Sequence, residues 1–275
     1  MPAKSRREMI EEMIAESPDD AELRYMLAME HVSAGDDAGA VRCFEEMIRR
    51  APDYHIGYAS LGGLLLSLGA YDRAIDTLRL AVNLRPDAVA FSNLGTAYFY
   101  AGRLTQAVDA YNQAFQFSDA DYRLWLNLGD AYYWLRNRPD QARDAYRQGL
   151  RLGREQMASR AQGGHSADPM IPAQLAAMFP KLGEPDSARV MLGQALALDS
   201  LNSRVQYQAA LTCWQLGARE QAIDWLKRAV AGGYPVVWLR DSPVHRDWQS
   251  APGFTTLLAS AQAGVERSPG RGGTR

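Results

Sequence analysis

The chain has 275 residues, a formal net charge of −2 and an apolar fraction of 47%, a composition typical of a folded protein with one large or two small domains. The near-neutral charge argues against nucleic acid as a partner, because phosphate binding needs a clustered surplus of lysine and arginine. The first residues, MPAKSRREMIEEMI, are too charged for a signal peptide, and no stretch reaches the roughly 18 apolar residues of a membrane span. Two lone cysteines fit a reducing compartment. We therefore expect a cytoplasmic protein that does not insert into membranes.

The chain begins with a short amphipathic segment, residues 5–20, which we expect to form one capping helix. The helix in this segment should end before Pro18, the first of three prolines that are spaced 34 residues apart: Pro18, Pro52 and Pro86. Each proline is followed by aspartate. Proline cannot continue a helix, and aspartate is a good N-cap for the next one. The spacing predicts a helical repeat of about 34 residues that begins near residue 21.

Small and large residues mark the same places in six successive units. The small residues are Ala40, Ala74, Ala107, Ala142, Ala188 and Ala222, and four positions after each comes a large one: Phe44, Leu78, Tyr111, Tyr146, Leu192 and Leu226. One helical turn separates the two, so they face the same side. Leu-Gly pairs precede them at 61–62, 94–95 and 128–129. Glycines at 69, 102, 183 and 217 fall at the turns, where a left-handed residue is useful. The pattern predicts paired helices that cross closely.

These markers match the tetratricopeptide-repeat (TPR) pattern, and the chain resembles the TPR superfamily. The resemblance implies an all-α, right-handed TPR α-solenoid of about six helix-turn-helix repeats between helical caps. We place the parts as follows: an N-terminal capping half-repeat at 5–20, repeats one to four at 21–156, an insertion at 157–168, repeats five and six at 169–235, a C-terminal helical cap at 236–263, and a disordered tail at 264–275.

The insertion follows from a spacing of 46 residues between Ala142 and Ala188. We expect one long helix that ends near Ala161, followed by a loop at 162–169. Two interpretations stay open: a tolerated insertion, or a hinge between a four-repeat block and a two-repeat block. Pro180 should end or kink the first helix of repeat five.

Motifs for chemistry are missing from the sequence. It contains no phosphate-binding GxxxxGK[ST] motif and no kinase signature. The four histidines are spread over different units, without metal-ligand spacing. His31 and Cys213 take the tyrosine position of their repeats, which predicts packed core residues. We expect no enzyme activity and no cofactor.

In TPR proteins the first helix of each repeat lines a concave groove, and the resemblance transfers this role to six positions per repeat. At one of these positions four successive repeats carry a side-chain amide: Asn93, Asn127, Gln174 and Gln208. Amides can bind the backbone of an extended chain. The alternative is that these are ordinary polar residues on a solvent-exposed face. In repeats four to six the implied groove positions are Arg123, Leu126, Asn127, Asp130, Tyr133, Trp134, Met170, Ala173, Gln174, Ala177, Lys181, Arg204, Tyr207, Gln208, Leu211, Trp214 and Gln215. Packing between repeats is the alternative for the aromatic ones. The candidate peptide-binding residues are Asn93, Tyr100, Arg123, Asn127, Asp130, Trp134, Gln174 and Gln208.

Some TPR proteins grip a C-terminal carboxylate with a Lys/Asn/Asn/Lys/Arg clamp. Here Asn93 and Arg123 match two clamp positions, whereas Ala59, Gly63 and Asn127 stand where the clamp needs Lys, Asn and Arg. The clamp is incomplete, which argues against binding of chaperone tails. We expect a scaffold that binds a peptide or protein segment, and a chain that is itself monomeric.

A closer resemblance rests on AFSNLGTAYFYAGR (90–103), LWLNLGDAYYW (124–134) and the ending GYPVVWLRDSP. These segments are similar to the TPR regions of bacterial signalling proteins, where such regions are fused to serine/threonine kinase or nucleotide cyclase domains. That similarity implies an alternative function, a regulatory module of such an enzyme. In the ending, Ser242-Pro243 and Ala251-Pro252 replace the usual Asp-Pro turns.

Overall fold

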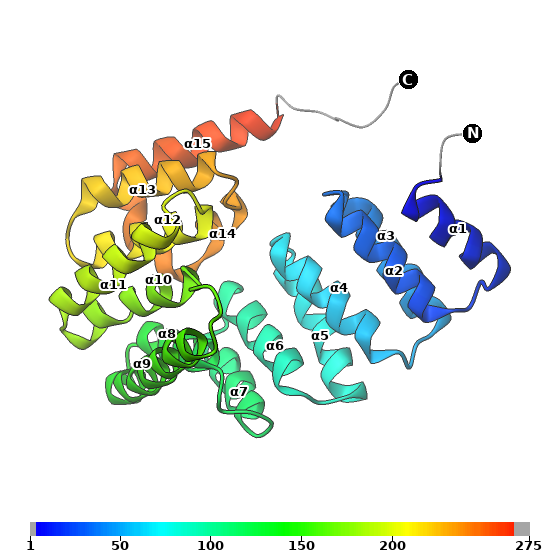
Figure 1. The fold of residues 1–275 in the computed structure, drawn as a ribbon, viewed down its shortest axis with the longest axis horizontal. Coiled ribbons are helices and arrows are strands. Elements are labelled where there is room, and N and C mark those ends of the chain that lie inside the picture. Colours follow the sequence, from blue (N-terminus) through cyan, green and yellow to red (C-terminus); the bar gives the residue numbers. More distant parts are fainter. Residues whose placement is uncertain (1–3, 267–275) are drawn as a thin grey trace. The chain divides into compact units, whose positions relative to one another are not determined.

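The computed structural model describes residues 4–266, and within that range the chain forms helices and loops without a strand. The chain divides into two compact units, Met1–Ser118 and Asp119–Arg275. Within each unit the helices follow one another as antiparallel pairs, coloured blue through cyan to blue-green in the first unit and green to red in the second (Figure 1). This arrangement confirms the expected all-α TPR solenoid fold.

The first unit consists of a capping helix followed by three helix pairs. The capping helix is α1 (Arg6–Glu16), which begins with a capping box between Ser5 and Glu8. The pairs are α2 (Ala21–Ser33) with α3 (Asp37–Arg50), α4 (His55–Ser67) with α5 (Tyr71–Leu84), and α6 (Ala88–Tyr100) with α7 (Leu104–Phe115).

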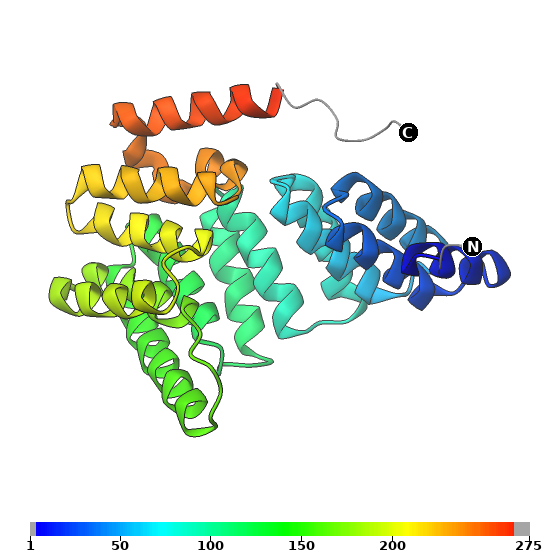
Figure 2. The same cartoon turned by 45° about the horizontal axis from the view of Figure 1, so that its top comes forward.

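The second unit also has three pairs, and then a different ending. The pairs are α8 (Tyr122–Leu135) with α9 (Pro139–Gln162), α10 (Met170–Ala176) and the 3-10 helix η1 (Phe179–Leu182) with α11 (Pro185–Leu198), and α12 (Ser203–Gln215) with α13 (Arg219–Ala231). The ending is α14 (Val236–Asp241), the 3-10 helix η2 (Pro243–Ser250) and α15 (Pro252–Glu266). Both views show α15 beside α13 (Figures 1 and 2).

The repeat markers pack as their spacing predicts. The six alanines and the six large residues that follow them are buried. In α4 the glycine of the Leu-Gly pair lies against the large residue of its own repeat: a Cβ on Gly62 would stand 2.5 Å from Leu78 Cγ. Gly95 and Gly129 face Tyr111 and Tyr146 in the same way, each at 2.6 Å. A glycine at this position therefore lets the two helices of a repeat approach closely.

The turns agree with the sequence, but the helix caps agree only in part. Gly69, Gly102, Gly183 and Gly217 all have positive φ, between 74° and 82°. Of the aspartates after the prolines, Asp87 caps α6 as expected. The prediction was wrong for Asp19, because Asp20 caps α2 by accepting hydrogen bonds from the backbone N–H groups of Glu22 and Leu23. It was also wrong for Asp53, because α4 begins after Tyr54 without a side-chain cap.

The inserted residues extend α9 to 24 residues, as expected, and a loop at 163–169 follows. The first helix of repeat five is broken near Pro180, where α10 gives way to η1. Repeats four and five nevertheless contact each other directly. Tyr122 Oη donates a hydrogen bond to Gln174 at 2.5 Å, and Gly153 lies where a Cβ would be 2.6 Å from Leu175. These contacts join repeats four and five on either side of the inserted residues.

The C-terminal helices cover the last repeat with large apolar side chains. Leu239, Trp248 and Phe254 are fully buried and join the core of α12 and α13. The helix α15 continues to Glu266, so residues 264–266 are helical rather than part of a tail. The rest of the expected disordered tail lies outside the described residues.

Candidate functional site

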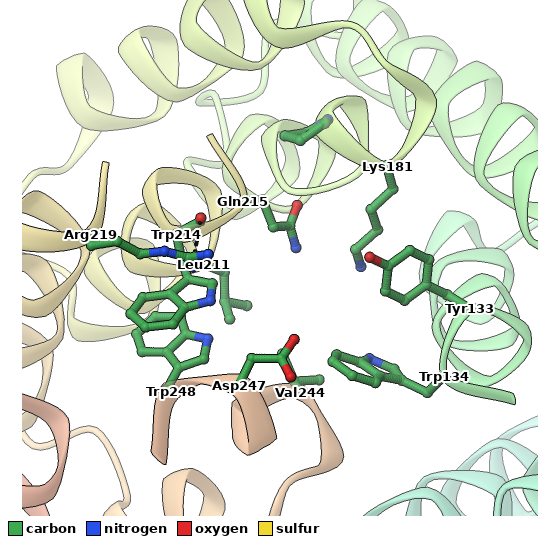
Figure 3. A pocket seen from close by; sticks show the side chains of 11 residues that line it. Tyr133, Trp134, Lys181, Leu211, Trp214, Gln215, Arg219, Val244, Asp247 and Trp248 are labelled. Atoms are coloured by element: carbon green, nitrogen blue, oxygen red, sulfur yellow. Dashed lines mark hydrogen bonds between the residues drawn. The ribbon is translucent and has the colours of Figure 1, made fainter. Parts of the chain in front are cut away.

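A cavity of about 220 Å³ lies within the second unit (Figure 3). Its walls come from the C-terminal end of α8, from η1, from the C-terminal half of α12, from the start of α13 and from η2. The lining residues are Tyr133, Trp134, Pro180, Lys181, Leu211, Trp214, Gln215, Arg219, Val244, Asp247 and Trp248. A second cavity of about 330 Å³ shares Tyr133, Trp134, Lys181 and Asp247 with it, so the two adjoin.

Two helices present equivalent faces at this place. On α8 the residues Asn127, Asp130 and Trp134 are three and four positions apart, and on α12 the residues Gln208, Leu211 and Gln215 have the same spacing. Residues with this spacing lie on one face of a helix. The TPR resemblance implied seventeen groove positions for repeats four to six, and six of them line the cavity. These six are at the C-terminal ends of the first helices, whereas the other eleven do not line it.

One wall contains a buried ion pair. Lys181 donates a hydrogen bond to Asp130, and only 7% of the lysine side chain is exposed. Tyr146 Oη also donates to Asp130 Oδ1, at 2.6 Å. The ammonium lies 4.9 Å from the centre of the Tyr146 ring and 5.6 Å from that of Tyr133. Burial beside Asp130 raises the pKa of Tyr146 well above its usual value. The charge of Lys181 is thus balanced inside the protein.

The opposite wall is a stack of three planar groups. The Arg219 guanidinium lies 3.8 Å from the ring centre of Trp214, and the Trp248 ring is stacked at 4.1 Å and 13°. Arg219 Nη1 also donates to the Trp214 carbonyl at 3.0 Å. Both faces of Trp214 are therefore covered. Figure 3 shows the indole edges of Trp214 and Trp248 turned toward the cavity.

Two buried polar atoms of the lining have no hydrogen-bond partner among the described residues: Trp134 Nε1 and Gln215 Oε1. Such atoms are uncommon in folded proteins. Asp247 forms no ion pair within residues 4–266, and its carboxylate points into the cavity beside Trp134 (Figure 3). Trp134 Nε1 and Gln215 Oε1 are themselves closed to solvent, whereas the carboxylate of Asp247 faces the open space as a negative charge.

His245 holds η2 in place from behind. Its ring is fully buried, packs edge-on against Trp248 at 5.2 Å, and lies with Nε2 3.2 Å from Tyr207 Oη. Burial lowers the pKa of His245 to about 3. The imidazole is therefore neutral near pH 7 and acts as a packing group under the cavity wall.

The structure brings some of the predicted site residues together and separates others. Trp134 lines the cavity, Asp130 lies behind it, and Asn127 and Gln208 continue the same helix faces. Two others are engaged within the chain: Gln174 with Tyr122, and Arg123 with Asp121 at 2.7 Å, at the start of its own helix. Asn93 and Tyr100 belong to the first unit, where Tyr100 stacks on Tyr71.

Sequence reasoning missed Pro180, Arg219, Val244 and Asp247 as lining residues and assigned Trp248 only to the cap. Three of these five are on η2, which lies outside the repeat and therefore carries no positional signal. Tyr133 is 45% exposed, so it belongs to the cavity surface rather than to the packing between repeats.

A third cavity, of about 290 Å³, lies in the first unit between α1, α2 and α3. It is lined mainly by charged side chains, with His31 and Cys43 among them. His31 is buried, as predicted, and its Nδ1 lies 2.7 Å from Asp36 Oδ2. Burial raises the pKa of the Cys43 thiol, which argues against a reactive thiolate. Within residues 4–266 no cluster of His, Cys, Asp and Glu is suited to a metal ion.

Antiparallel helix pairs that stack through small-to-large contacts define a helical-repeat protein. The family follows from the comparison with known proteins. Tetratricopeptide-repeat models match residues 8–89 and 181–235, and further TPR models match residues 95–135 and 123–148. Together these ranges cover more than half of the chain, which belongs to the TPR family. TPR proteins are protein-interaction scaffolds and are typically not catalytic.

Individual relatives support this assignment. The Hsp70-Hsp90 organizing protein of Triticum aestivum is 31% identical over 100 residues, which is 36% of this chain and 17% of the relative. The structure of the APC/C hetero-tetramer Cut9-Hcn1 is similar with a TM-score of 0.63 and 17% identity, over 92% of this chain and 45% of that one. The chain therefore spans less than half of both relatives.

PilF of Pseudomonas aeruginosa is similar over 93% of this chain and its own full length, with a TM-score of 0.54 and 16% identity. At such identities these structures show the fold alone. The relatives support a TPR protein in general and not the narrower likeness to kinase- or cyclase-associated regions. No helix of the described residues has the length and apolar character that a membrane crossing requires.

Proposed function

We propose that the chain holds an extended segment of a partner protein, and that this segment enters the cavity between α8, η1, α12 and η2. One observation carries the proposal: Trp134 Nε1 and Gln215 Oε1 are buried in the lining without a partner. The first can only donate a hydrogen bond and the second can only accept one.

A peptide unit is the complement of this pair, because it offers one carbonyl acceptor and one N–H donor. A buried polar group without a partner costs about 1–3 kcal/mol. A peptide that supplies both partners recovers that cost on binding, once the Trp134 and Gln215 side chains turn to expose these atoms. The two adjoining cavities, of about 220 and 330 Å³, have room for a short extended segment. Aromatic walls of this kind commonly carry much of the affinity of protein interfaces.

Only some of the residues predicted from sequence are available for this peptide. Asn127 and Gln208 extend the lining along α8 and α12, and their amides are available to a bound backbone. Gln174 must leave Tyr122, and Arg123 must leave Asp121, before either binds a partner. Asn93 and Tyr100, in the first unit, stay predictions of the sequence.

The test selects binding peptides from a random displayed library and measures synthetic copies by calorimetry. We expect Trp134→Phe and Gln215→Met each to weaken binding about tenfold, because each loses one buried hydrogen bond while keeping most of the side-chain volume. Trp225→Phe is the matched control, since Trp225 packs under Arg228 on α13 and does not line the cavity. Equal affinities for all four proteins would contradict the proposal.

The likeness to signalling TPR regions leaves a second candidate function, regulation of a serine/threonine kinase or nucleotide cyclase. It is tested most cheaply by the genomic neighbourhood. A kinase, cyclase or receptor gene beside the gene for this chain is the expected result. Its absence across related genomes would count against this candidate.

A further inference from the structure

We infer that the cavity selects a basic side chain, arginine above all, with Asp247 as its counter-ion and Trp134 as its platform. The inference rests on the proposed function, since it names the kind of residue that the bound segment places there. It also gives the C-terminal cap a second role, because Asp247 is on η2 rather than on a repeat.

The first argument is the balance of charge around the cavity. Three ionic side chains line it: Lys181, Arg219 and Asp247. Lys181 is neutralised by Asp130 within the wall. Arg219 is held against the Trp214 ring and its carbonyl, on the side of the stack away from Trp248. Asp247 alone among the three has neither an ion pair nor a side-chain hydrogen bond within residues 4–266.

The second argument is the surface next to that carboxylate. Tyr133 and Trp134 meet edge to face at 5.5 Å, and Figure 3 shows both rings bordering the space into which Asp247 points. Cations bind over aromatic faces, and the flat guanidinium of arginine can stack on an indole while donating two hydrogen bonds to a carboxylate. Lysine has one ammonium and no flat face, so it meets only part of this arrangement.

The contact that we assign to the partner, an arginine stacked on a tryptophan ring, also occurs within the protein. Arg219 stacks on Trp214 in the same cavity, at 3.8 Å from the ring centre. An acidic side chain is disfavoured at this place. It would lie beside the negative charge of Asp247, and Lys181 is already paired with Asp130. The adjoining cavity does contain Arg136 and Arg143, so an acidic peptide is the alternative that the experiment has to include.

The experiment uses three peptides, acetyl-Gly-Gly-X-Gly-Gly-amide, in which X is arginine, citrulline or glutamate. Citrulline keeps the shape of arginine and removes the charge. Binding to the full chain is followed at millimolar concentrations through the NMR signal of the Trp134 indole N–H. We expect the arginine peptide to shift this signal and to bind about tenfold more tightly than the citrulline peptide. Added salt should weaken the arginine peptide selectively.

The variants separate the charge from the rest of the site. In Asp247→Asn the arginine peptide should fall to the affinity of the citrulline peptide, which itself should not change. Asp186→Asn is the matched control, because its carboxylate is 95% exposed on α11 and the net charge changes equally. Neither variant should alter the melting temperature, since both side chains are exposed.

Each outcome bears on one of the two proposals. If none of the three peptides shifts the Trp134 signal, the proposed peptide site itself is wrong. If the citrulline or glutamate peptide binds as tightly as the arginine peptide, the site stands and the selectivity for a basic side chain is wrong. An unchanged preference for arginine in Asp247→Asn would overturn the assignment of Asp247.

Discussion

Two neighbouring glycines of α4 should respond to alanine with opposite changes in stability. A Cβ on Gly62 would stand 2.5 Å from Leu78 Cγ and 2.7 Å from its Cδ2, which is too close for any real contact. A Cβ on Gly63 would meet only the Asn93 side-chain nitrogen, at 4.0 Å, which is an ordinary contact. Both residues are inside the same helix, so their backbone contributions are the same.

The magnitudes follow from two effects. Alanine in place of glycine inside a helix stabilises by about 0.5–1 kcal/mol, because it restricts the unfolded chain and favours the helix. Gly63→Ala should gain that amount. Gly62→Ala gains it too, but it forces an extra methyl group against Leu78, which is fully buried and cannot move away. Overpacking of this kind costs about 1–3 kcal/mol, which makes Gly62→Ala destabilising by about 1–2 kcal/mol.

The assay is urea unfolding followed by far-UV circular dichroism, with thermal melting alongside. A change of 1 kcal/mol corresponds to about 2–4 °C in melting temperature for a protein of this size. We expect the melting temperature of Gly63→Ala to rise and that of Gly62→Ala to fall. If both variants were stabilised equally, the close approach of α4 and α5 would be wrong, and with it the packing reason for the Leu-Gly marker.

Two further predictions concern the walls of the cavity. Asp130→Ala removes the carboxylate shared by Lys181 and Tyr146, and it should cost about 3–5 kcal/mol in urea unfolding because it leaves a buried charge unpaired; a loss below about 1 kcal/mol would mean that Lys181 is solvated. The pKa of His245 is about 3 in the folded protein, below the pKa of about 6.5 of an unfolded histidine. The unfolded state therefore binds the proton first, and stability is lost as pH falls from about 6.5 toward 3. Between pH 6 and 4 the unfolding free energy of His245→Phe should therefore depend on pH less steeply than that of the wild type, by up to about 1.4 kcal/mol per pH unit; identical slopes would show that the ring is not buried.

The sequence carries most of the information about the repeats. The same packing recurs about every 34 residues, and it is marked by the proline spacing, the alanine positions and the Leu-Gly pairs. Because several units show the same markers, the repeat can be recognised from the sequence. Positive φ at Gly69 and Gly183 follows from the same register. The repeat-derived walls of the cavity were predictable for the same reason, since Trp134 and Gln215 occupy equivalent positions of repeats four and six.

The remaining features depend on contacts that do not recur. Asp247 and Trp134 are more than 100 residues apart and meet because η2 folds against the last repeats, where no repeat position predicts its place. The partner of Lys181 was hidden because Pro180 breaks the helix and changes the direction of the following residues. Likewise, Asp20 rather than Asp19 caps α2 because the chain needs one more residue after Pro18 before the helix begins.

The central claim, a peptide site inside the second unit, is tested most directly by mapping amide chemical shifts on adding a selected peptide. The prediction is that the shifted signals belong to the C-terminal ends of α8 and α12, to η1 and to η2, together with the indole N–H of Trp134. Shifts confined to α2, α4 and α6 of the first unit, with the Trp134 signal unmoved, would contradict it.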